Sequence, residues 1–414
     1  MIPHDLQHQY LLLLPLLPSD ISLNSLRVAY GPALKEVFQQ LAHVSADFDT
    51  KDTDIILTVA VACKGLSCPK YSQIQQIYAL IYRLTCILTM EMSIDIEFGN
   101  DIDIRVVILY SAEKDQLDKN ARNLSLRLNN LVDLASSQRL WNKVYSMESE
   151  SGEELLHEFL QSWNVSTSVV QQDGTIIRVP GGLTVRIAHN EPLHSRNEFV
   201  ECWTPHRSVA VGGTFDHLHA GHKLLLTMTA LVLEPANISN ESQERHLTIG
   251  ITGDDLLKNK SHRNELETWE ERQSSVQGFL LDFLLCLSAK NSLTHSESVG
   301  NHQGREVYNA LHSGVHIKYK EIFDPFGPTI TDPNIAALVI SAETRAGGKA
   351  VNDKRAEKKW HALEVFEVDV LDIAAGTGEQ TQSDFESKIS STEIRSKIHQ
   401  KKAEAEAYAK LKGD

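Results

Sequence analysis

The second half of the chain alternates short apolar runs with segments whose apolar residues recur at helical spacing. The apolar runs are typical of strands, and they occupy residues 208–211, 246–252, 315–322, 336–341 and 363–371. Helical spacing marks residues 222–233, 267–287 and the stretch from about Ser391. Strands separated by helices predict an α/β domain whose parallel sheet is covered on both faces.

The first half shows a similar pattern without an evident chemical motif. Strands are predicted at 10–17, 54–62 and 104–110, and helices at 33–43, 71–90 and 120–145. A polar stretch at 146–154 and a β-like stretch at 168–179, with a turn at Asp173 and Gly174, follow them. We therefore predict a separate N-terminal α/β domain over residues 1–200 and a second domain over 201–414.

Three polar stretches, rich in Gly, Ser and Asn or Gln, interrupt the second half. They lie at 233–245, 291–306 and 374–388. Such composition predicts surface insertions or mobile loops.

The composition limits the classes of function. The chain has 414 residues, 42% of them hydrophobic, and a formal net charge of -15. The acidic balance argues against nucleic acid or an anionic membrane as a partner. No apolar run reaches the roughly 20 residues of a membrane span, and no basic start of a signal peptide precedes the first run. Five scattered cysteines favour reduced thiols, so we expect a cytoplasmic protein and leave the nucleus open.

The segment "GGTFDHLHAGH", residues 212–222, carries the clearest chemistry. Gly212 and Gly213 end a strand, where backbone N–H groups without a neighbouring Cβ can approach an anion closely. His219 and His222 lie three residues apart at the start of a helix, whose free N–H groups favour phosphate. The pattern predicts a phosphate site.

Two other interpretations of this segment are a metal site and an ordinary turn. A metal would need further ligands beside the two histidines, and Asp216 and His217 are the nearby candidates. The chain has no H-E-x-x-H sequence and no cluster of Cys and His. We therefore expect no metal bound by protein side chains alone.

The segment resembles the signature of the HxGH nucleotidyltransferases. A second mark of that family, "ISSTEIR" at residues 389–395, stands near the C-terminus. It is also a capping box formed by Ser390 and Glu393. The resemblance implies a Rossmann-like sheet. It also implies that the phosphates of ATP are bound by Ser390, Ser391, Thr392 and, one turn further along, Arg395.

The segments between these marks resemble the eukaryotic and archaeal type of phosphopantetheine adenylyltransferase. They are "GITGDDLLKNK" and "DPFGPTITDPNIAALVISAETRAGGKAVNDKR", and the likeness runs over residues 208–399. This part of the chain is similar to the transferase domain of the bifunctional CoA synthase. The chain holds no G-x-x-x-x-G-K-[ST] sequence, so the kinase of that enzyme is not expected.

The resemblance implies a role for each matching residue. The phosphate-facing turn would be formed by Gly212, Gly213, Thr214 and Phe215. His219 and His222 would hold the ATP phosphates. Lys258, favoured over Lys260, would clamp the acceptor phosphate and the α-phosphate, and Arg345 would bind phosphate. The plainer interpretations are a solvated helix end for the lysines and a surface turn for Arg345.

The implied reaction transfers the adenylyl group of ATP to 4′-phosphopantetheine in coenzyme A biosynthesis, giving dephospho-CoA and pyrophosphate. Mg²⁺ would be held mainly through the ATP phosphates. One alternative is a transferase of the same fold acting on nicotinate or nicotinamide mononucleotide or on a phospho-alcohol. Another is a non-catalytic scaffold for other enzymes of the CoA pathway.

Overall fold

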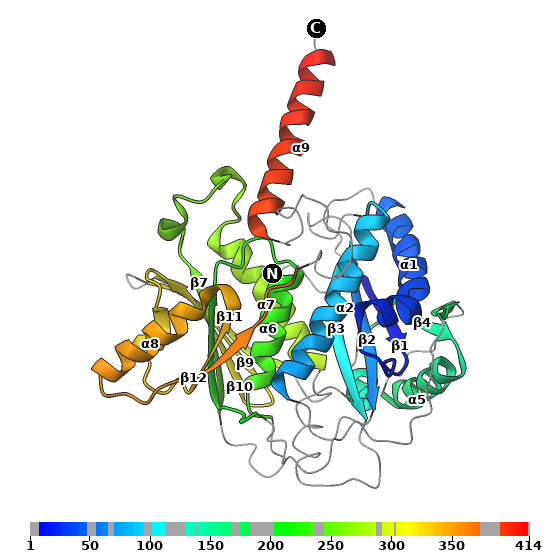
Figure 1. Cartoon of the computed structure of the whole chain (residues 1–414), viewed down its shortest axis with the longest axis horizontal. Helices are drawn as coiled ribbons and strands as arrows, with labels where there is room; N and C mark the ends of the chain where they lie inside the picture. The colour runs from blue at the N-terminus through cyan, green and yellow to red at the C-terminus, as the bar shows by residue number, and fades with distance from the viewer. Residues whose placement is uncertain are drawn as a thin grey trace. The chain divides into compact units, whose positions relative to one another are not determined.

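The chain forms two compact units in a computed structural model (Figure 1). The first unit comprises Met1–Pro205, Glu234–Gln243 and Leu281–Ser292, and the second comprises His206–Leu233, Glu244–Leu280 and Leu293–Asp414. The structure describes residues 8–47, 55–64, 70–94, 102–111, 130–137, 139–166, 174–182, 203–235, 244–286, 292–301, 304–372 and 390–412. The predicted domain boundary between residues 200 and 201 lies outside these ranges and stays a prediction.

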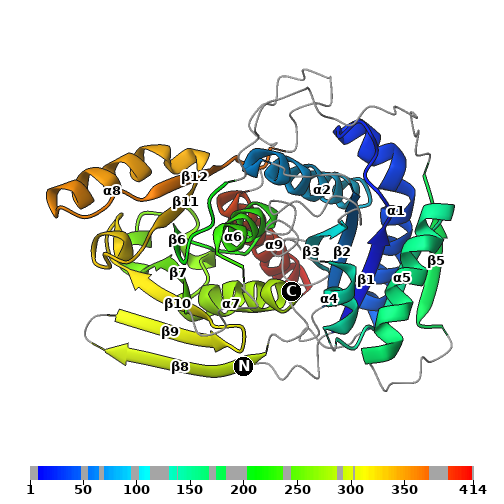
Figure 2. The same ribbon diagram turned by 90° about the horizontal axis from the view of Figure 1, so that it is seen from below.

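The first unit is built on a parallel five-stranded sheet in the order β3-β2-β1-β4-β5. Its strands are β1 (His8–Leu14), β2 (Ile55–Lys64), β3 (Asp103–Ser111), β4 (Lys143–Glu148) and β5 (Ile176–Pro180). Its helices are α1 (Leu23–Asp47), α2 (Tyr71–Glu91), α4 (Leu131–Ser136) and α5 (Glu150–Ser166). Helix α1 packs with α2 on one face of the sheet and α4 packs with α5 on the other (Figure 2).

The predicted helix over residues 120–145 is confirmed at α4 and wrong from Lys143 onward, within its described part. That part holds the short helix α4 and the start of β4, which pairs with β1 on one side and with β5 on the other. The polar stretch at 146–154 completes β4 and begins α5. Ser146 is fully buried there, and its hydroxyl donates to the Gly152 carbonyl at 3.2 Å. The polar composition of this stretch therefore gave no indication of a strand that lies between β1 and β5.

The second unit contains a seven-stranded sheet in the order β12-β11-β6-β7-β10-β9-β8. Its strands are β6 (Ser208–Gly213), β7 (Arg245–Thr252), β8 (Leu293–Asn301), β9 (Gly304–Leu311), β10 (Val315–Ile322), β11 (Ala337–Ser341) and β12 (Glu364–Val368). All neighbours from β12 to β10 are parallel, whereas β9 and β8 are antiparallel additions at one edge. The predicted fold class, a Rossmann-like parallel sheet preceded by another α/β domain, is confirmed.

Four helices accompany this second sheet in the described ranges. They are α6 (Ala220–Val232), α7 (Trp269–Cys286), α8 (Arg345–Glu357) and α9 (Ser391–Lys412), with short 3-10 turns η2 (Asp254–Leu257), η3 (Arg263–Glu265), η4 (Gly327–Ile330) and η5 (Ala342–Thr344). Figure 2 shows α6 and α7 on one face and α8 on the other. No helix in the described ranges is long and apolar enough to cross a bilayer.

Two segments of the second unit differ from expectation. Residues 291–306, predicted as a loop, contain β8 and the start of β9, whereas 291 and 302–303 lie outside the described residues. Strand β8 is exposed along its length, so it needs no apolar alternation. The surface turn considered around Arg345 is instead η5 followed by α8. The predicted loops at 233–245 and 374–388 lie largely or wholly outside the described residues.

The strand order creates a switch point between β6 and β11. From β6 the chain first builds β7 and β10 on one side, and then returns to place β11 on the other side. In open parallel sheets, ligands bind outside the carboxyl ends of the strands at such a point. Here those ends are Gly213 and Ser341, so the segments that follow them form the candidate site.

Candidate active site

A tight turn leads from the end of β6 into α6. Phe215 adopts a left-handed backbone conformation, with φ of 52°, and its side chain is fully buried. Its ring lies under Gly213, where an added Cβ would come within 3.0 Å of it. Glycine is therefore needed at 213 for the turn to close, and Phe215 can offer a ligand only its main chain.

His219 caps the N-terminus of α6 and has a fixed tautomer. Its Nδ1 accepts the Gly221 N–H at 3.2 Å, so the ring proton lies on Nε2. The His222 ring stacks on the His219 ring with centroids 3.9 Å apart and planes at 24°. A Cβ on Gly221 would come within 3.1 Å of the His219 ring. The glycine between the histidines thus permits their stacking.

Both histidines are neutral at physiological pH. Burial, reinforced by the neighbouring His222, lowers the pKa of His219 well below 6.5. Burial, reinforced by His217, lowers the pKa of His222 to about 3. The His222 Nδ1 is buried without a hydrogen-bond partner among the described residues. A neutral imidazole still carries one N–H donor, so the pair can donate to phosphate without being charged.

Arg395, from the start of α9, reaches back to the same turn. Its Nη1 donates to Asp216 Oδ2 at 2.5 Å, its Nε to the Ser261 carbonyl at 3.0 Å and its Nη2 to Thr392 Oγ1 at 3.1 Å. Arg395 is 2% exposed and Asp216 is 0% exposed. Ser390 accepts the Glu393 N–H at 3.3 Å, so this hydroxyl caps α9 as half of the expected box.

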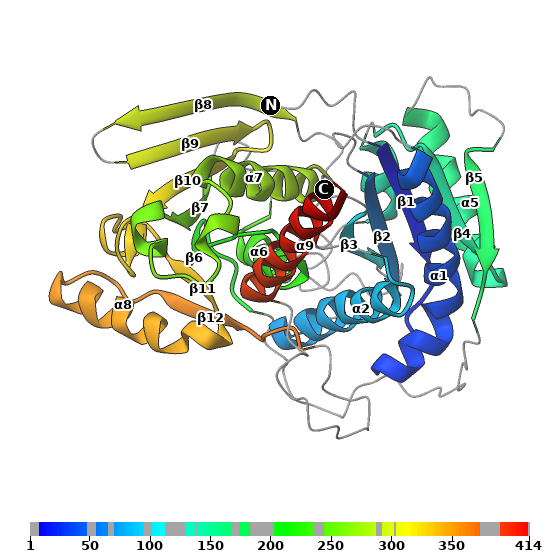
Figure 3. The ribbon, with the colours of Figure 1, turned by 90° about the horizontal axis from the view of Figure 1, so that it is seen from above.

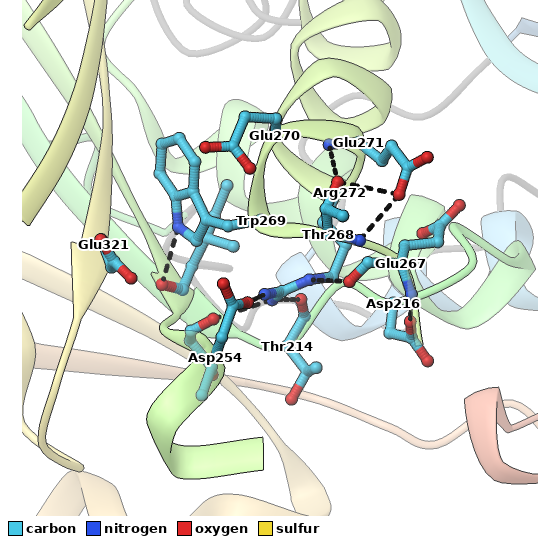
Figure 4. A network of polar contacts seen from close by, with 12 residues as sticks. Thr214, Asp216, Asp254, Glu267, Thr268, Trp269, Glu270, Glu271, Arg272 and Glu321 are labelled. Atoms are coloured by element: carbon cyan, nitrogen blue, oxygen red, sulfur yellow. Dashed lines mark hydrogen bonds and ion pairs between the residues drawn. The ribbon is translucent and has the colours of Figure 1, made fainter. Parts of the chain in front are cut away.

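Arg272, which the sequence did not single out, holds the strand ends in place. It is fully buried on α7. Its Nη1 donates to the carbonyls of Thr214 and Thr252 at 2.8 Å, its Nη2 to Asp254 at 2.9 Å and its Nε to the Glu267 carbonyl at 3.2 Å (Figure 4). One guanidinium thus joins the segments that leave β6 and β7. An arginine near the start of an amphipathic helix carries no signal for this role in the sequence.

The residues considered as extra metal ligands have protein partners. Asp216 Oδ1 accepts the Glu267 N–H at 3.0 Å, and Glu267 Oε2 accepts the His217 N–H at 2.6 Å. The His217 Nε2 lies 2.7 Å from the Glu265 carbonyl and donates to it. These contacts bind the turn to the residues before α7, which Figure 4 shows beside it.

The two predicted cationic residues lie in exposed ion pairs. Lys258 contacts Asp255 at 2.7 Å, and Arg345 is bound through both oxygens of Glu367. No contact among the described residues joins either cation to His219 or His222. Topology does place Arg345 in the segment after β11, beside the end of β6. The phosphate-binding roles of these residues, and of the other predicted site residues, stay predictions.

Residues 1–185 match a family described as "Domain of unknown function (DUF8446)". An uncharacterized protein of Schizosaccharomyces pombe is 28% identical over 267 residues, which cover 64% of this chain and 68% of that protein.

Other relatives have a named activity. A phosphopantetheine adenylyltransferase of Saccharomyces cerevisiae is 31% identical over 45% of this chain, and the match spans only about half of the yeast protein, 47%. A phosphopantetheine adenylyltransferase of Pyrobaculum aerophilum is 31% identical over 160 residues, which cover 39% of this chain and 77% of the archaeal protein. The chain belongs to the phosphopantetheine adenylyltransferase family.

Proposed function

We propose that this chain transfers the adenylyl group of ATP to 4′-phosphopantetheine, giving dephospho-CoA and pyrophosphate, as an enzyme of the eukaryotic and archaeal type. The observation that carries the proposal is the neutral, stacked pair of His219 and His222 at the N-terminus of α6. It lies at the carboxyl end of β6, beside the switch point of the sheet. The names of the relatives support the choice of acceptor.

The chemistry requires positioning and charge stabilisation. A phosphate oxygen of 4′-phosphopantetheine attacks the α-phosphorus of ATP, and the bond to the pyrophosphate oxygen breaks. The acceptor is already an anionic nucleophile, so no covalent enzyme intermediate is needed. His219 donates from Nε2, and His222 donates from the nitrogen that carries its proton. Together with the free N–H groups of α6 they stabilise negative charge that grows on the transferring phosphate.

The remaining predicted residues complete the phosphate site. Main-chain groups of residues 212–215 and the first turn of α9, with Ser391 and Thr392, face the triphosphate. Lys258 and Arg345 bind phosphate after leaving their carboxylate partners, which costs at most about 1 kcal/mol for exposed pairs. ATP enters as its Mg²⁺ complex, with the ion held by phosphates and water as part of the substrate. Asp216 and Glu267 are already engaged by protein groups.

The test measures pyrophosphate release by the full chain with Mg²⁺-ATP and one acceptor at a time. Release is expected with 4′-phosphopantetheine. Nicotinamide mononucleotide and phosphocholine should give background rates. Release with one of these instead would assign a different acceptor, and release with none would favour a scaffold for other enzymes of the CoA pathway.

The variant His222→Ala tests the role of the histidine pair. Loss of one transition-state donor is expected to lower kcat by roughly 10²-fold or more, with a smaller change in KM. His295→Ala, on the exposed strand β8, is the control. Equal and small losses in both parameters would assign His222 to ground-state binding instead.

A further inference from the structure

The two phosphate-facing segments of the second unit are joined by one buried ion pair. Asp216 and Arg395 are 179 positions apart in the chain, yet neither is more than 2% exposed. Figures 1 and 3 show α9 starting beside α6 and then running away from the sheet. The pair lies where the two helices begin.

The contacts of Arg395 hold its guanidinium in one position. All three guanidinium nitrogens already donate to protein acceptors on three different segments. Moving the guanidinium to a phosphate would leave Asp216 as a buried charge without its ion-pair partner, which is strongly unfavourable. Arg395 therefore links these segments through its own protein contacts.

The segments that Arg395 joins are those that carry the proposed phosphate ligands. Asp216 lies two positions after Thr214 and three before His219. The Ser261 carbonyl lies in the segment that carries Lys258, and Thr392 lies in the first turn of α9. A second contact between α9 and this segment is an exposed ion pair of Lys402 with Glu265.

We propose that Asp216 and Arg395 form a positioning pair, which holds the first turn of α9 against the turn of His219 and His222 so that both bind one triphosphate. This inference rests on the proposed function, because it assumes that ATP is the ligand. The pair makes the ATP site depend on α9.

The first test measures hydrogen exchange of α9 amides in the ligand-free full chain. Arg395→Lys keeps the positive charge but removes the guanidinium, whose three nitrogens donate to three acceptors. Hydrogen exchange in residues 392–398 should therefore quicken by about tenfold or more. The double variant Asp216→Asn with Arg395→Met removes both charges and avoids a lone buried ion. It should fold with a melting temperature near that of the parent and show the same faster exchange. Lys402→Met, on the exposed side of α9, should leave exchange in residues 392–398 unchanged.

The second test separates positioning from a merely structural role. For Arg395→Lys and the double variant, KM for ATP and the dissociation constant of α,β-methylene-ATP should rise by about tenfold, which corresponds to 1.4 kcal/mol. KM for 4′-phosphopantetheine should rise less than KM for ATP, because only the Ser261 contact of Arg395 reaches the segment of Lys258. Faster exchange with unchanged nucleotide binding would overturn the proposal, as would unchanged exchange.

The same measurements distinguish this inference from the proposed function. A parent protein that binds the ATP analogue but uses no 4′-phosphopantetheine would overturn the proposed function only. The effect of the variants on exchange and on binding of the analogue would still decide the role of the pair. A parent protein that does not bind the analogue would overturn both.

Discussion

The residues at the start of α6 owe their properties to burial. His219 and His222 are held neutral because the low-dielectric surroundings disfavour their charged forms. From the sequence alone, these two histidines were compatible with a phosphate site, a metal site or an ordinary turn. The tautomer of His219, which decides what it can donate, follows only from the Gly221 N–H that the fold aims at Nδ1.

Stability is expected to fall as the solution is acidified through pH 6. The native pKa values of His219 and His222 lie below the unfolded value of about 6.5, so the unfolded chain binds more protons and acid favours it. Each histidine should lower the free energy of unfolding by on the order of 1 kcal/mol per pH unit below about pH 6, and for His222 this should continue toward its native pKa of about 3. Urea midpoints at pH 7, 6 and 5 measure this. The double variant His219→Gln, His222→Gln should show a weaker dependence, and the same dependence would contradict the expectation.

Replacing Gly221 by alanine should damage activity without damaging the fold. The new Cβ would press on the His219 ring, which must then shift from its stacked position. Alanine is otherwise the better helix former, so the urea midpoint should stay the same or rise. We expect kcat to fall by roughly tenfold or more, as loss of aligned donors does. Gly278→Ala on α7, where a Cβ meets nothing within 4 Å, is the matched control and should keep full activity.

At the scale of elements, the periodic segments were predictable and the chemically unusual ones were not. The strands and helices with strong apolar patterns, such as α7 and β10, lie where the sequence placed them. Strand β8 and the end of β4 were not predicted. The first is exposed, and the second buries the polar side chain of Ser146, whose hydroxyl donates to the carbonyl of Gly152, six positions later. Helix α8 was not predicted, because its glycines indicated a turn. In the structure, Gly348 permits close packing on Ile340 and Val365.

The candidate site, too, was predictable from the sequence only in part. The order and spacing of "GGTFDHLHAGH" and "ISSTEIR" indicated a phosphate site without any structure. The partners of Arg272 and Arg395 depend on carbonyls and a carboxylate from distant segments, which no local pattern encodes. The sequence therefore indicated which segments form the candidate site. The contacts that each residue makes within these segments follow only from the fold.

Substitution of Arg272 should destabilise the second unit more than the loss of an exposed ion pair does. Arg272→Met leaves the carbonyls of Thr214, Thr252 and Glu267 without this donor, and the cost of a broken buried network is roughly 3–5 kcal/mol. Lys354→Met on α8, which breaks an exposed pair with Glu357, should cost at most about 1 kcal/mol. Urea unfolding of both variants compares these costs. Equal midpoints would show that the guanidinium adds nothing to the strand ends.

At the scale of the whole molecule, α7 belongs to both units. Its residues from Leu281 onward are grouped with the first unit, where Asp282 binds Arg105 at 2.8 Å and Arg139 at 2.6 Å. These two arginines lower the pKa of Asp282 although burial raises it. Cys286 joins the apolar core of the first unit. The first unit is therefore not complete without part of a helix that begins in the second.

A fragment that starts at residue 195 should consequently be less stable than the full chain. It keeps Asp282 and Cys286 but loses the arginines and the core that surround them. We expect low soluble yield or a lower urea midpoint, with recovery when residues 1–200 are supplied in trans. The fragment with Asp282→Asn and Cys286→Ser should gain solubility over the unmodified fragment. A soluble and fully active unmodified fragment would show that the end of α7 needs no partner.

The strand order of the second unit also has a consequence for synthesis. Strand β6 lies near the middle of its sheet and leaves the ribosome first, but its neighbour β11 is made more than a hundred residues later. Such long-range pairings make folding slow and leave strand edges exposed in the meantime. The ion pair of Asp216 can form only later still, because Arg395 is synthesised 179 positions after it. The nascent second unit should therefore be most dependent on chaperones between the completion of β10 and the release of α9.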